Sequence, residues 1–321
     1  MVEYVKETTP NMIEINAIHK SFGDQQALRE VGFSVGEGEL FGLIGPDGAG
    51  KTTLIRILTT LLLADAGTAR VAGYDVVGDY RQIRRQVGYM PGRFSLYQDL
   101  SVEENLQFFA SNFGTTVAEN YDLIKDIYQQ LEPFRTRRAG NLSGGMKQKL
   151  ALCCALVHRP TVLFLDEPTT GVDPVSRQEF WGMLKQLQQN GITILVSTPY
   201  MDEAGLCDRI ALIQQGEILG IDTPQGIRDS YPHPLWQIEG GDRYRMLRFL
   251  RQQTFTHSAF PFGESLHLAT RSEMPREAIA EALRSADFSV SSLQLITPTI
   301  EDCFMDRMGQ PARAQNQHHA Q

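Results

Sequence analysis

The segment GPDGAGKTT, residues 45–53, constrains the fold of this chain more than any other feature. It follows the apolar run 40–44 and precedes the helix-like run TTLIRILTTLLL. A glycine-rich turn between a strand and a helix lets several backbone N–H groups, and the positive end of the helix, point at an anion. Lys51 adds a full positive charge, so the segment predicts a phosphate-binding loop in an α/β fold. The residues predicted to touch the phosphates are Gly45, Pro46, Asp47, Gly48, Ala49, Gly50, Lys51, Thr52 and Thr53.

Two adjacent carboxylates end a second apolar run. TVLFL leads into Asp166 and Glu167, and ligands of open α/β sheets lie at the carboxyl ends of strands. Neighbouring side chains alternate along a strand, so Asp166 can face a Mg²⁺ ion, directly or through a water, beside the Thr52 hydroxyl. Glu167 then faces the space beyond a terminal phosphate, where it can deprotonate a water while Lys51 stabilises the phosphate charge. The sequence Asp-Glu-Pro is also ordinary loop chemistry, so this pair alone does not decide the function.

A third segment, LSGGMKQK from Leu142, predicts a second phosphate cradle. A Ser-Gly-Gly turn that opens a helix offers a hydroxyl and bare N–H groups to an anion. This segment resembles the signature motif of the ATP-binding cassette (ABC) family, and the resemblance covers residues 13–229. It implies ATP and Mg²⁺ as ligands, ATP hydrolysis, and a P-loop NTPase cassette with a RecA-like core, an antiparallel β subdomain and a helical subdomain. Phe22, in KSFG, matches the family's aromatic that stacks on adenine; the other interpretation is a hydrophobic turn residue.

The resemblance also implies a head-to-tail dimer. Ser143, Gly144 and Gly145 of one cassette would cap the γ-phosphate that Lys51 of the other cassette holds. Asp173, in TTGVDP, matches the loop that crosses the dimer interface of the family. Ser143, Gly145 and Asp173 are therefore the expected interface residues, and the second cassette can be the same chain or a different one.

Two positions depart from the family pattern. After YMP the family usually places a glutamine that touches the metal or the attacking water, and this chain has Gly92. In LVSTPYMDEA the family usually places a histidine on the γ-phosphate, and this chain has Pro199, which carries no donor. Thr198 or Tyr200 would replace that histidine only after a backbone shift. Because a lost donor of this kind costs about 2 to 4 kcal/mol, the sequence predicts ATP binding with slow hydrolysis.

The pattern of the chain predicts two folded parts and a tail. Residues 1–230 predict the cassette, with residues 91–140 as its helical subdomain. Residues 231–308 predict a small α+β domain, for which a ferredoxin-like plait is one arrangement, and residues 309–321 predict a disordered tail. Expected strands are 13–20, 28–35, 40–44, 162–165, 192–197, 265–270 and 290–296, and expected helices are 102–113, 117–131, 176–190, 242–253, 275–284 and 297–308.

Composition narrows the class of partner. The chain has 30 Lys and Arg against 38 Asp and Glu, a net charge of −8, and its basic residues are scattered. This argues against nucleic acid as a partner. No apolar run approaches the roughly 18 residues that a membrane helix needs, and MVEYVKETTP is not a secretory signal. We therefore expect a cytoplasmic chain, peripheral on the cytoplasmic face of the plasma membrane, with separately encoded transmembrane permease subunits. Four cysteines without metal-site spacing are expected to be reduced packing residues: Cys153, Cys154, Cys207 and Cys303.

Three further segments resemble the cassettes of ABC-2 type exporters: RFSLYQDLSVEEN from Arg93, TPYMDEAGLCDRI from Thr198 and TPTIEDCFMDRM from Thr297. The first hypothesis is an ATP-binding subunit that powers export of a drug, a lipid or another small amphiphile. The alternative is a regulatory or degenerate cassette that binds ATP without useful turnover and pairs with a catalytic cassette. A third class, a soluble ABC protein acting on ribosomes or DNA, would need tandem cassettes, a long coiled coil or a basic patch.

Overall fold

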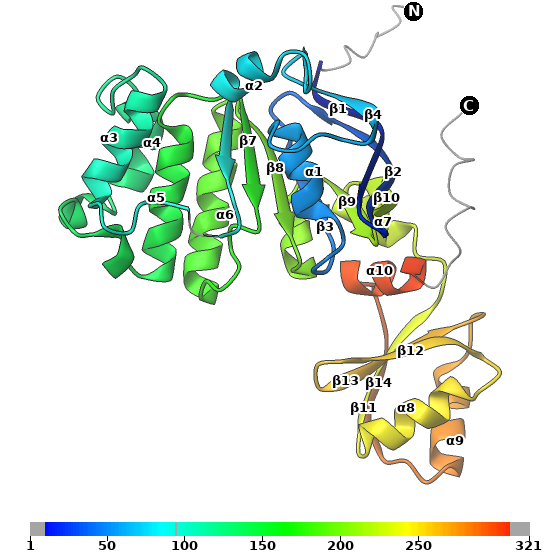
Figure 1. Cartoon of the computed structure of the whole chain (residues 1–321). Helices are drawn as coiled ribbons and strands as arrows, with labels where there is room; N and C mark the ends of the chain where they lie inside the picture. The colour runs from blue at the N-terminus through cyan, green and yellow to red at the C-terminus, as the bar shows by residue number, and fades with distance from the viewer. Residues whose placement is uncertain (1–9, 94, 309–321) are drawn as a thin grey trace, which may run out of the picture. The chain divides into compact units, whose positions relative to one another are not determined.

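The computed structural model of the chain describes residues 10–93 and 95–308 (Figure 1). It divides into two compact units, Met1–Pro224 and Gln225–Gln321. The boundary thus falls at Pro224 and not at residue 230, the predicted end of the cassette. The predicted disordered tail, 309–321, lies outside the described residues.

A six-stranded sheet forms the centre of the first unit, in the order β10-β9-β3-β8-β7-β6. Neighbouring strands from β9 to β6 are parallel, and β10 is antiparallel to β9. Every residue of β3, β7 and β8 is buried, as expected for parallel strands with both faces covered. Their carboxyl ends therefore meet at one edge of the sheet, where the predicted site residues follow. The strands are β3 (Leu40–Ile44), β6 (Val87–Met90), β7 (Val162–Asp166), β8 (Thr193–Thr198), β9 (Arg209–Gln214) and β10 (Glu217–Asp222).

A second sheet of the first unit is antiparallel, with the strand order β2-β1-β4-β5, and lies beside the central sheet (Figure 1). Buried side chains of this sheet, such as Ile13 and Val31, share one hydrophobic core with Phe41 of β3 and with Leu54 of helix α1 (Lys51–Leu58). This shared core fixes the helix that follows the phosphate loop. The elements are β1 (Asn11–Phe22), β2 (Gln25–Gly36), α1 (Lys51–Leu58), β4 (Ala66–Val71), β5 (Tyr74–Asp75) and α2 (Tyr80–Gln86).

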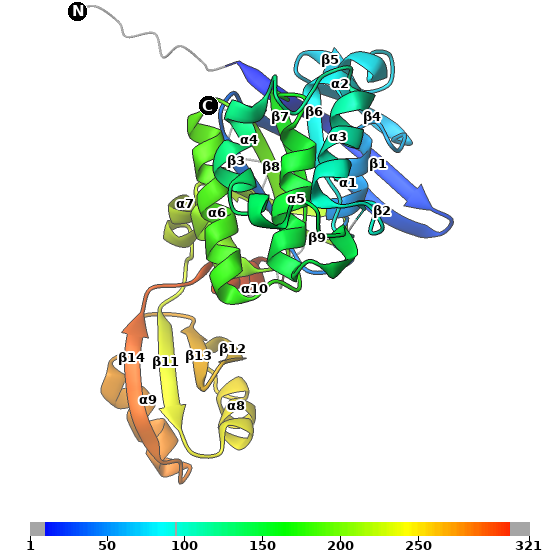
Figure 2. The same cartoon turned by 90° about the vertical axis from the view of Figure 1, so that its left-hand side faces the viewer.

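Helices α3 and α4 both pack on α5, away from the antiparallel sheet (Figures 1 and 2). A capping box, in which Ser101 and Glu104 bond each other's backbone N–H groups, starts α3. The predicted helix 117–131 is shorter in the structure, since α4 covers Tyr121–Tyr128. None of the described helices has the length and apolarity to cross a membrane. The helices here are α3 (Val102–Asn112), α4 (Tyr121–Tyr128), α5 (Gly144–Leu156) and α6 (Pro174–Gln189), with 3₁₀ turns at Glu132–Phe134, Ala139–Asn141 and Met201–Leu206.

The second unit is built on a four-stranded antiparallel sheet in the order β12-β13-β11-β14. Its chain order, β11-α8-β12-β13-α9-β14, is that of a ferredoxin-like plait. Trp236, Leu268 and Leu283 belong to its hydrophobic core. The elements are α7 (Pro224–Asp229), β11 (Leu235–Gly240), α8 (Arg243–Arg251), β12 (Thr256–Phe262), β13 (Ser265–Thr270), α9 (Arg276–Ser285), β14 (Val290–Ile296) and α10 (Ile300–Met308).

All four cysteines are free thiols in buried positions, which gives a first prediction. Burial raises the pKa of Cys153, Cys154 and Cys207 and raises that of Cys303 to about 11. Since the thiolate is the reactive form, we expect a thiol reagent at pH 8 to label the native chain only slowly and the denatured chain at all four positions. Fast labelling of a native thiol, measured by time-resolved absorbance, would contradict this packing.

Candidate functional site

The phosphate loop is a close-packed turn between β3 and α1. A Cβ atom on Gly45 would lie 2.1 Å from the carbonyl oxygen of Ile213, and one on Gly50 would lie 2.6 Å from that of Ala27. Gly50 also has φ 107°, a conformation that favours glycine. These two glycines therefore hold the loop in a shape that no other residue fits, with α1 beginning at Lys51.

Lys51 is a buried cation at the start of α1, with only 3% of its surface exposed. Its Nζ donates to the carbonyl oxygens of Gly45 at 2.7 Å and Pro46 at 2.9 Å. It also forms an ion pair with Glu167 Oε1 at 3.0 Å. A buried ammonium needs an anionic partner, and Glu167 provides one here. A phosphate in the loop would compete with Glu167 for this charge.

Asp166 is a buried carboxylate with two hydroxyl donors. Its Oδ1 accepts from Thr52 Oγ1 at 3.0 Å and from Ser197 Oγ at 2.8 Å. Burial, and the negative charge of Asp166, raise the pKa of the nearby Tyr89 hydroxyl. Neighbouring oxygen ligands around Mg²⁺ lie about 2.9 Å apart, given metal–oxygen distances of about 2.0 to 2.1 Å in octahedral geometry. The oxygens of Thr52 and Asp166 therefore fit a magnesium ion or one of its waters.

Glu167 holds an unusual backbone conformation. Its φ is 51°, in the left-handed region, although it is not a glycine. Its N–H donates to both the carbonyl oxygen and the Oγ of Ser197, each at 3.1 Å. Such strain persists only when the surroundings fix it, and it concentrates at functional sites. Ser197 thus binds the Asp166 carboxylate and also fixes the main chain of Glu167.

Gly92 lies directly beside the main chain of Asp166 and the Cβ atom of Glu167. A Cβ atom on Gly92 would lie 2.8 Å from the carbonyl oxygen of Asp166 and 3.8 Å from the Cβ of Glu167. The position where the family pattern has a glutamine is therefore adjacent to the predicted catalytic pair. In this chain the space for any side chain is closed by backbone.

Pro199 follows β8 and has neighbours that are already engaged. The hydroxyl of Thr198 donates to the buried carboxylate of Glu203 and accepts from the N–H of Tyr200 at 3.1 Å. The Tyr200 ring lies under the Arg177 guanidinium, 4.1 Å away, and Arg177 pairs with Glu203 at 3.6 Å. The Thr198 hydroxyl is therefore already engaged, and the Tyr200 ring lies against Arg177.

The signature segment caps α5. Ser143 is its N-cap residue, and the Ser143 hydroxyl accepts from Met146 N–H at 3.3 Å. Ser143 and Gly144 are exposed, so the start of α5 is open to an anion. In Figure 1, α5 and α1 lie on opposite sides of β7. Within one chain the two predicted phosphate cradles are therefore on separate elements.

Asp173 has a local role that the sequence did not predict. It is the N-cap of α6, and its carboxylate accepts from Ser176 N–H at 3.0 Å. That backbone N–H lowers the pKa of Asp173. Ser176 also closes the space around Gly145, where a Cβ atom would lie 2.8 Å from Ser176 Oγ. The start of α6 thus supports the signature turn.

Phe22 ends β1 with half of its surface, 51%, exposed. The Nζ of Lys20 lies 5.6 Å from the centre of its ring. Asp47 and Gly48, at the tip of the phosphate loop, are exposed as well. An exposed aromatic face can stack on a base, which is the geometry that the sequence predicts for Phe22.

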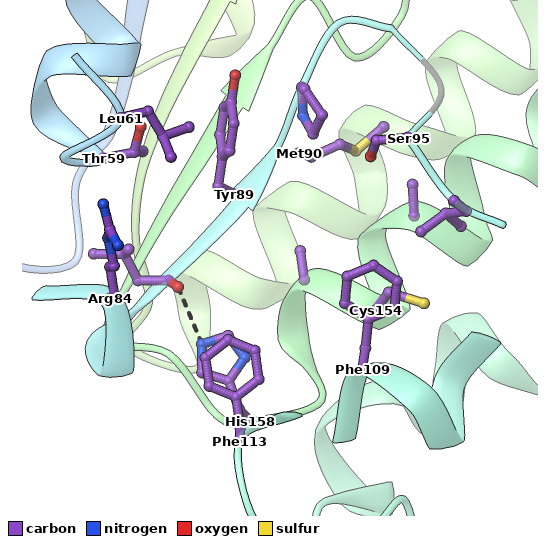
Figure 3. A pocket seen from close by; sticks show the side chains of 15 residues that line it. Thr59, Leu61, Arg84, Tyr89, Met90, Ser95, Phe109, Phe113, Cys154 and His158 are labelled. Atoms are coloured by element: carbon purple, nitrogen blue, oxygen red, sulfur yellow. Dashed lines mark hydrogen bonds between the residues drawn. The ribbon is translucent and has the colours of Figure 1, made fainter. Parts of the chain in front are cut away.

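A separate apolar cavity of about 340 Å³ lies between β6 and the helices α3 and α5 (Figure 3). Phe113 and His158 stack in it at 3.7 Å, and His158 Nε2 lies 3.0 Å from the carbonyl oxygen of Val87. Burial lowers the pKa of His158. None of the predicted nucleotide-binding residues lines this cavity, but Met90 and Pro91, just before Gly92, do.

Ser197 and Glu203 make contacts around the site that no sequence motif predicts. Ser197 pairs with Asp166 in the register of the parallel strands β7 and β8, so it could have been found once those strands were taken as neighbours. Glu203, 2% exposed, lies in a short 3₁₀ helix that carries no apolar periodicity. It accepts from Thr169 Oγ1 at 2.8 Å and so joins the segment after Glu167 to the segment after Pro199.

The family model described as ABC transporter matches residues 28–170 of this chain. Among solved structures, one titled "Structure of ATP binding subunit of ABC transporter" is 29% identical with a TM-score of 0.63, over 68% of this chain and 93% of that chain. The ADP conformation of another ATP-binding cassette of an ABC transporter is 25% identical, with a TM-score of 0.60, and the match covers 68% of this chain and 93% of that chain.

Three of the curated relatives match over 92–93% of this chain. "Probable multidrug ABC transporter ATP-binding protein YbhF" of Escherichia coli (strain K12) is 40% identical over 306 residues, 93% of this chain and 52% of that protein. "Nod factor export ATP-binding protein I" of Rhizobium sp. (strain N33) is 34% identical over 92% of this chain and 97% of that protein. "Daunorubicin resistance ATP-binding protein DrrA2" of Streptomyces coeruleorubidus is 32% identical over 92% of this chain and 95% of that protein. This chain spans about half the length of the first relative and almost all of the other two.

Proposed function

This chain belongs to the ATP-binding proteins of the ABC transporter family, and we propose that it binds and hydrolyses ATP to power an exporter of a drug, a lipid or another small amphiphile. The observation that carries the proposal is the convergence of Lys51, Glu167, Asp166 and Thr52 at the end of the phosphate loop. The names of the relatives, which include multidrug, Nod factor export and daunorubicin resistance proteins, support export as the transport direction.

We propose that the phosphate loop holds the β- and γ-phosphates of ATP through its backbone N–H groups and Lys51. The exposed ring of Phe22 would stack on the adenine. Thr52 and Asp166 would hold Mg²⁺, which neutralises phosphate charge when bound, and Ser197 would keep Asp166 aligned.

The Lys51–Glu167 ion pair suggests how the site prepares for hydrolysis. With Lys51 bound to Glu167, this carboxylate is held away from a role as base. A terminal phosphate would take Lys51 as its partner, because both anions need the same cation. Glu167 would then be released to orient and deprotonate the attacking water. In this proposal nucleotide binding itself activates the general base.

We also propose that two cassettes act together. Ser143 and Gly144 at the opening of α5 are exposed and lie apart from α1, so this turn is available to the phosphates of a second cassette. Asp173 fixes the start of α6 beside that turn and would lie at the interface. The partner cassette can be a second copy of this chain or a different one.

A permease is the other proposed partner, encoded separately, with this chain on the cytoplasmic face of the membrane. The cavity between β6, α3 and α5 is large and apolar enough to receive side chains of a permease segment. Its wall continues through Met90 and Pro91 to Gly92, beside the carboxylates. A permease side chain in the cavity would therefore shift the position of Asp166 and Glu167 through Met90, Pro91 and Gly92.

We expect slow Mg-ATP hydrolysis, and we expect Pro199→His to raise turnover by about 100-fold, the usual contribution of one donor to a developing negative charge. Pro199 is half-buried, so a histidine has room there. Gly92→Gln should bring no gain, because its Cβ atom would collide with the carbonyl oxygen of Asp166. Both expectations are tested by measuring steady-state phosphate release. The measurement compares the purified wild type, each single variant and the double variant.

The control for the space argument is Gly92→Ala, which adds the Cβ atom alone. We expect it to lower turnover, since the end of β7 must move. Unchanged turnover in Gly92→Ala would contradict the crowding at this position. Equal rates of ATP hydrolysis by the wild type and Pro199→His would show that the lack of a histidine at position 199 does not slow the reaction. No hydrolysis in any variant would instead favour the regulatory cassette.

A further inference from the structure

Three side chains that the nucleotide site does not use converge in the second unit. They are His233, in the segment before β11, His257 in β12 and Asp306 in α10. One ligand atom from each lies within 4.8 Å of the other two. The residues come from three separate segments of the chain, so their convergence is a product of the tertiary fold.

Both imidazole rings point the same nitrogen at the same carboxylate oxygen. His257 Nε2 lies 3.1 Å from Asp306 Oδ1, and His233 Nε2 lies 3.7 Å from that oxygen. The second distance is too long for a hydrogen bond, so hydrogen bonding to Asp306 explains only one of the two rings. The rings themselves stack at 3.7 Å.

Two features of the backbone hold the histidines in place. His233 stands between Pro232 and Pro234, whose fixed φ angles restrict the segment. His257 occupies an irregularity in the pairing of β12 with β13, where Thr256 pairs with Thr270 but Ser258 pairs with Ala269. His257 is thus the extra residue of a bulge, a feature that redirects a side chain.

The distances suit a metal ion. Zinc binds His nitrogen at about 2.0 to 2.1 Å and carboxylate oxygen at about 2.0 to 2.2 Å in tetrahedral geometry, which places ligand atoms about 3.3 to 3.5 Å apart. The two measured distances to Asp306, 3.1 and 3.7 Å, bracket this range. An imidazole-rich set selects transition metals over Mg²⁺ or Ca²⁺.

We propose that His233, His257 and Asp306 form a binding site for a divalent transition-metal ion of the zinc class. The carboxylate is buried, while the His233 and His257 side chains are 19% and 32% exposed, so a fourth position is open to water. The ion would join α10 to β12 and to the segment before β11. Its consequence would be a firmer attachment of the last described helix to the plait.

The test is equilibrium dialysis of the whole chelator-treated chain against Zn²⁺ without nucleotide, with bound metal counted by mass spectrometry. It is made in a His318→Ala/His319→Ala background, because that pair lies next to the chain end and could bind metal by itself. We expect one Zn²⁺ per chain. Co²⁺ in its place should give the visible absorption of a four-coordinate site.

His233→Ala, His257→Ala and Asp306→Asn should each weaken Zn²⁺ binding by more than about 100-fold, since loss of even an outer partner of a ligand costs about 10- to 100-fold. Glu301→Gln, an exposed carboxylate on the same helix, is the matched control and should keep the metal. Asp306→Cys, which restores a zinc ligand, should recover binding and so separates ligand loss from misfolding.

Two results would overturn the site. One is less than stoichiometric Zn²⁺ in the tail-substituted chain at micromolar metal. The other is binding that survives His233→Ala, His257→Ala and Asp306→Asn. In either case the cluster would be an imidazole–carboxylate contact that only holds α10.

Discussion

Glu167→Gln is expected to lower Mg-ATP hydrolysis by about 10²- to 10⁴-fold, the usual contribution of a positioned general base. The amide keeps the size of the side chain and the backbone bonds to Ser197 but cannot accept a proton. The same change should also tighten ATP binding, because it removes the carboxylate that pairs with Lys51. We therefore expect slower turnover together with a stable ATP-bound dimer.

Two measurements separate these effects. Phosphate release is compared for the wild type and Glu167→Gln, in the native background and in the Pro199→His background where turnover is expected to be faster. Dimer formation with ATP and Mg²⁺ is followed by light scattering. Glu217→Gln, which removes a carboxylate paired with Arg29 outside the site, is the control and should change neither. If Glu167→Gln leaves turnover and association unchanged, Glu167 is not the base.

The parts of the site that could be predicted are those carried by short contiguous segments. The tight turn of residues 45–53 between β3 and α1 follows from the glycine spacing and from the strand and helix flanks, and phosphate binding there stays a prediction. The buried strands β3, β7 and β8 follow from their apolar runs. The helix after Asp173 was also expected, although it starts two residues earlier, at Pro174.

The parts that escaped prediction depend on contacts between distant segments. The edge strand β12 was missed because Pro261 interrupts its pattern, and proline is tolerated only where no hydrogen bond of the sheet is lost. The Lys51–Glu167 ion pair joins the first residue of α1 to the residue after β7, and the sequence does not state that these two positions are in contact. The crowding at Gly92 is likewise visible only once β6 lies beside β7. Such features can be predicted only when the strand order and the side-chain packing are known.

Lys51→Ala is expected to weaken ATP binding by about 100-fold or more, since truncating one member of a buried charged pair costs about 2 to 5 kcal/mol. The change removes the ammonium group that donates to the loop carbonyls of Gly45 and Pro46. It also leaves the Glu167 carboxylate unneutralised beside the phosphates. Binding is measured by calorimetry with a non-hydrolysable ATP analogue, and thermal unfolding shows whether the chain stays folded. Lys185→Ala, an exposed cation paired with Asp208, is the control.

The double variant Lys51→Ala/Glu167→Gln distinguishes the two reasons for this loss. If Lys51 acts mainly by neutralising Glu167, removal of the carboxylate should recover part of the affinity, and the two changes will not be additive. If Lys51 acts only through the phosphate, the double variant will bind ATP as weakly as Lys51→Ala. We expect partial recovery, because the two side chains form an ion pair at 3.0 Å. Tight binding retained by Lys51→Ala itself would refute the phosphate-loop assignment.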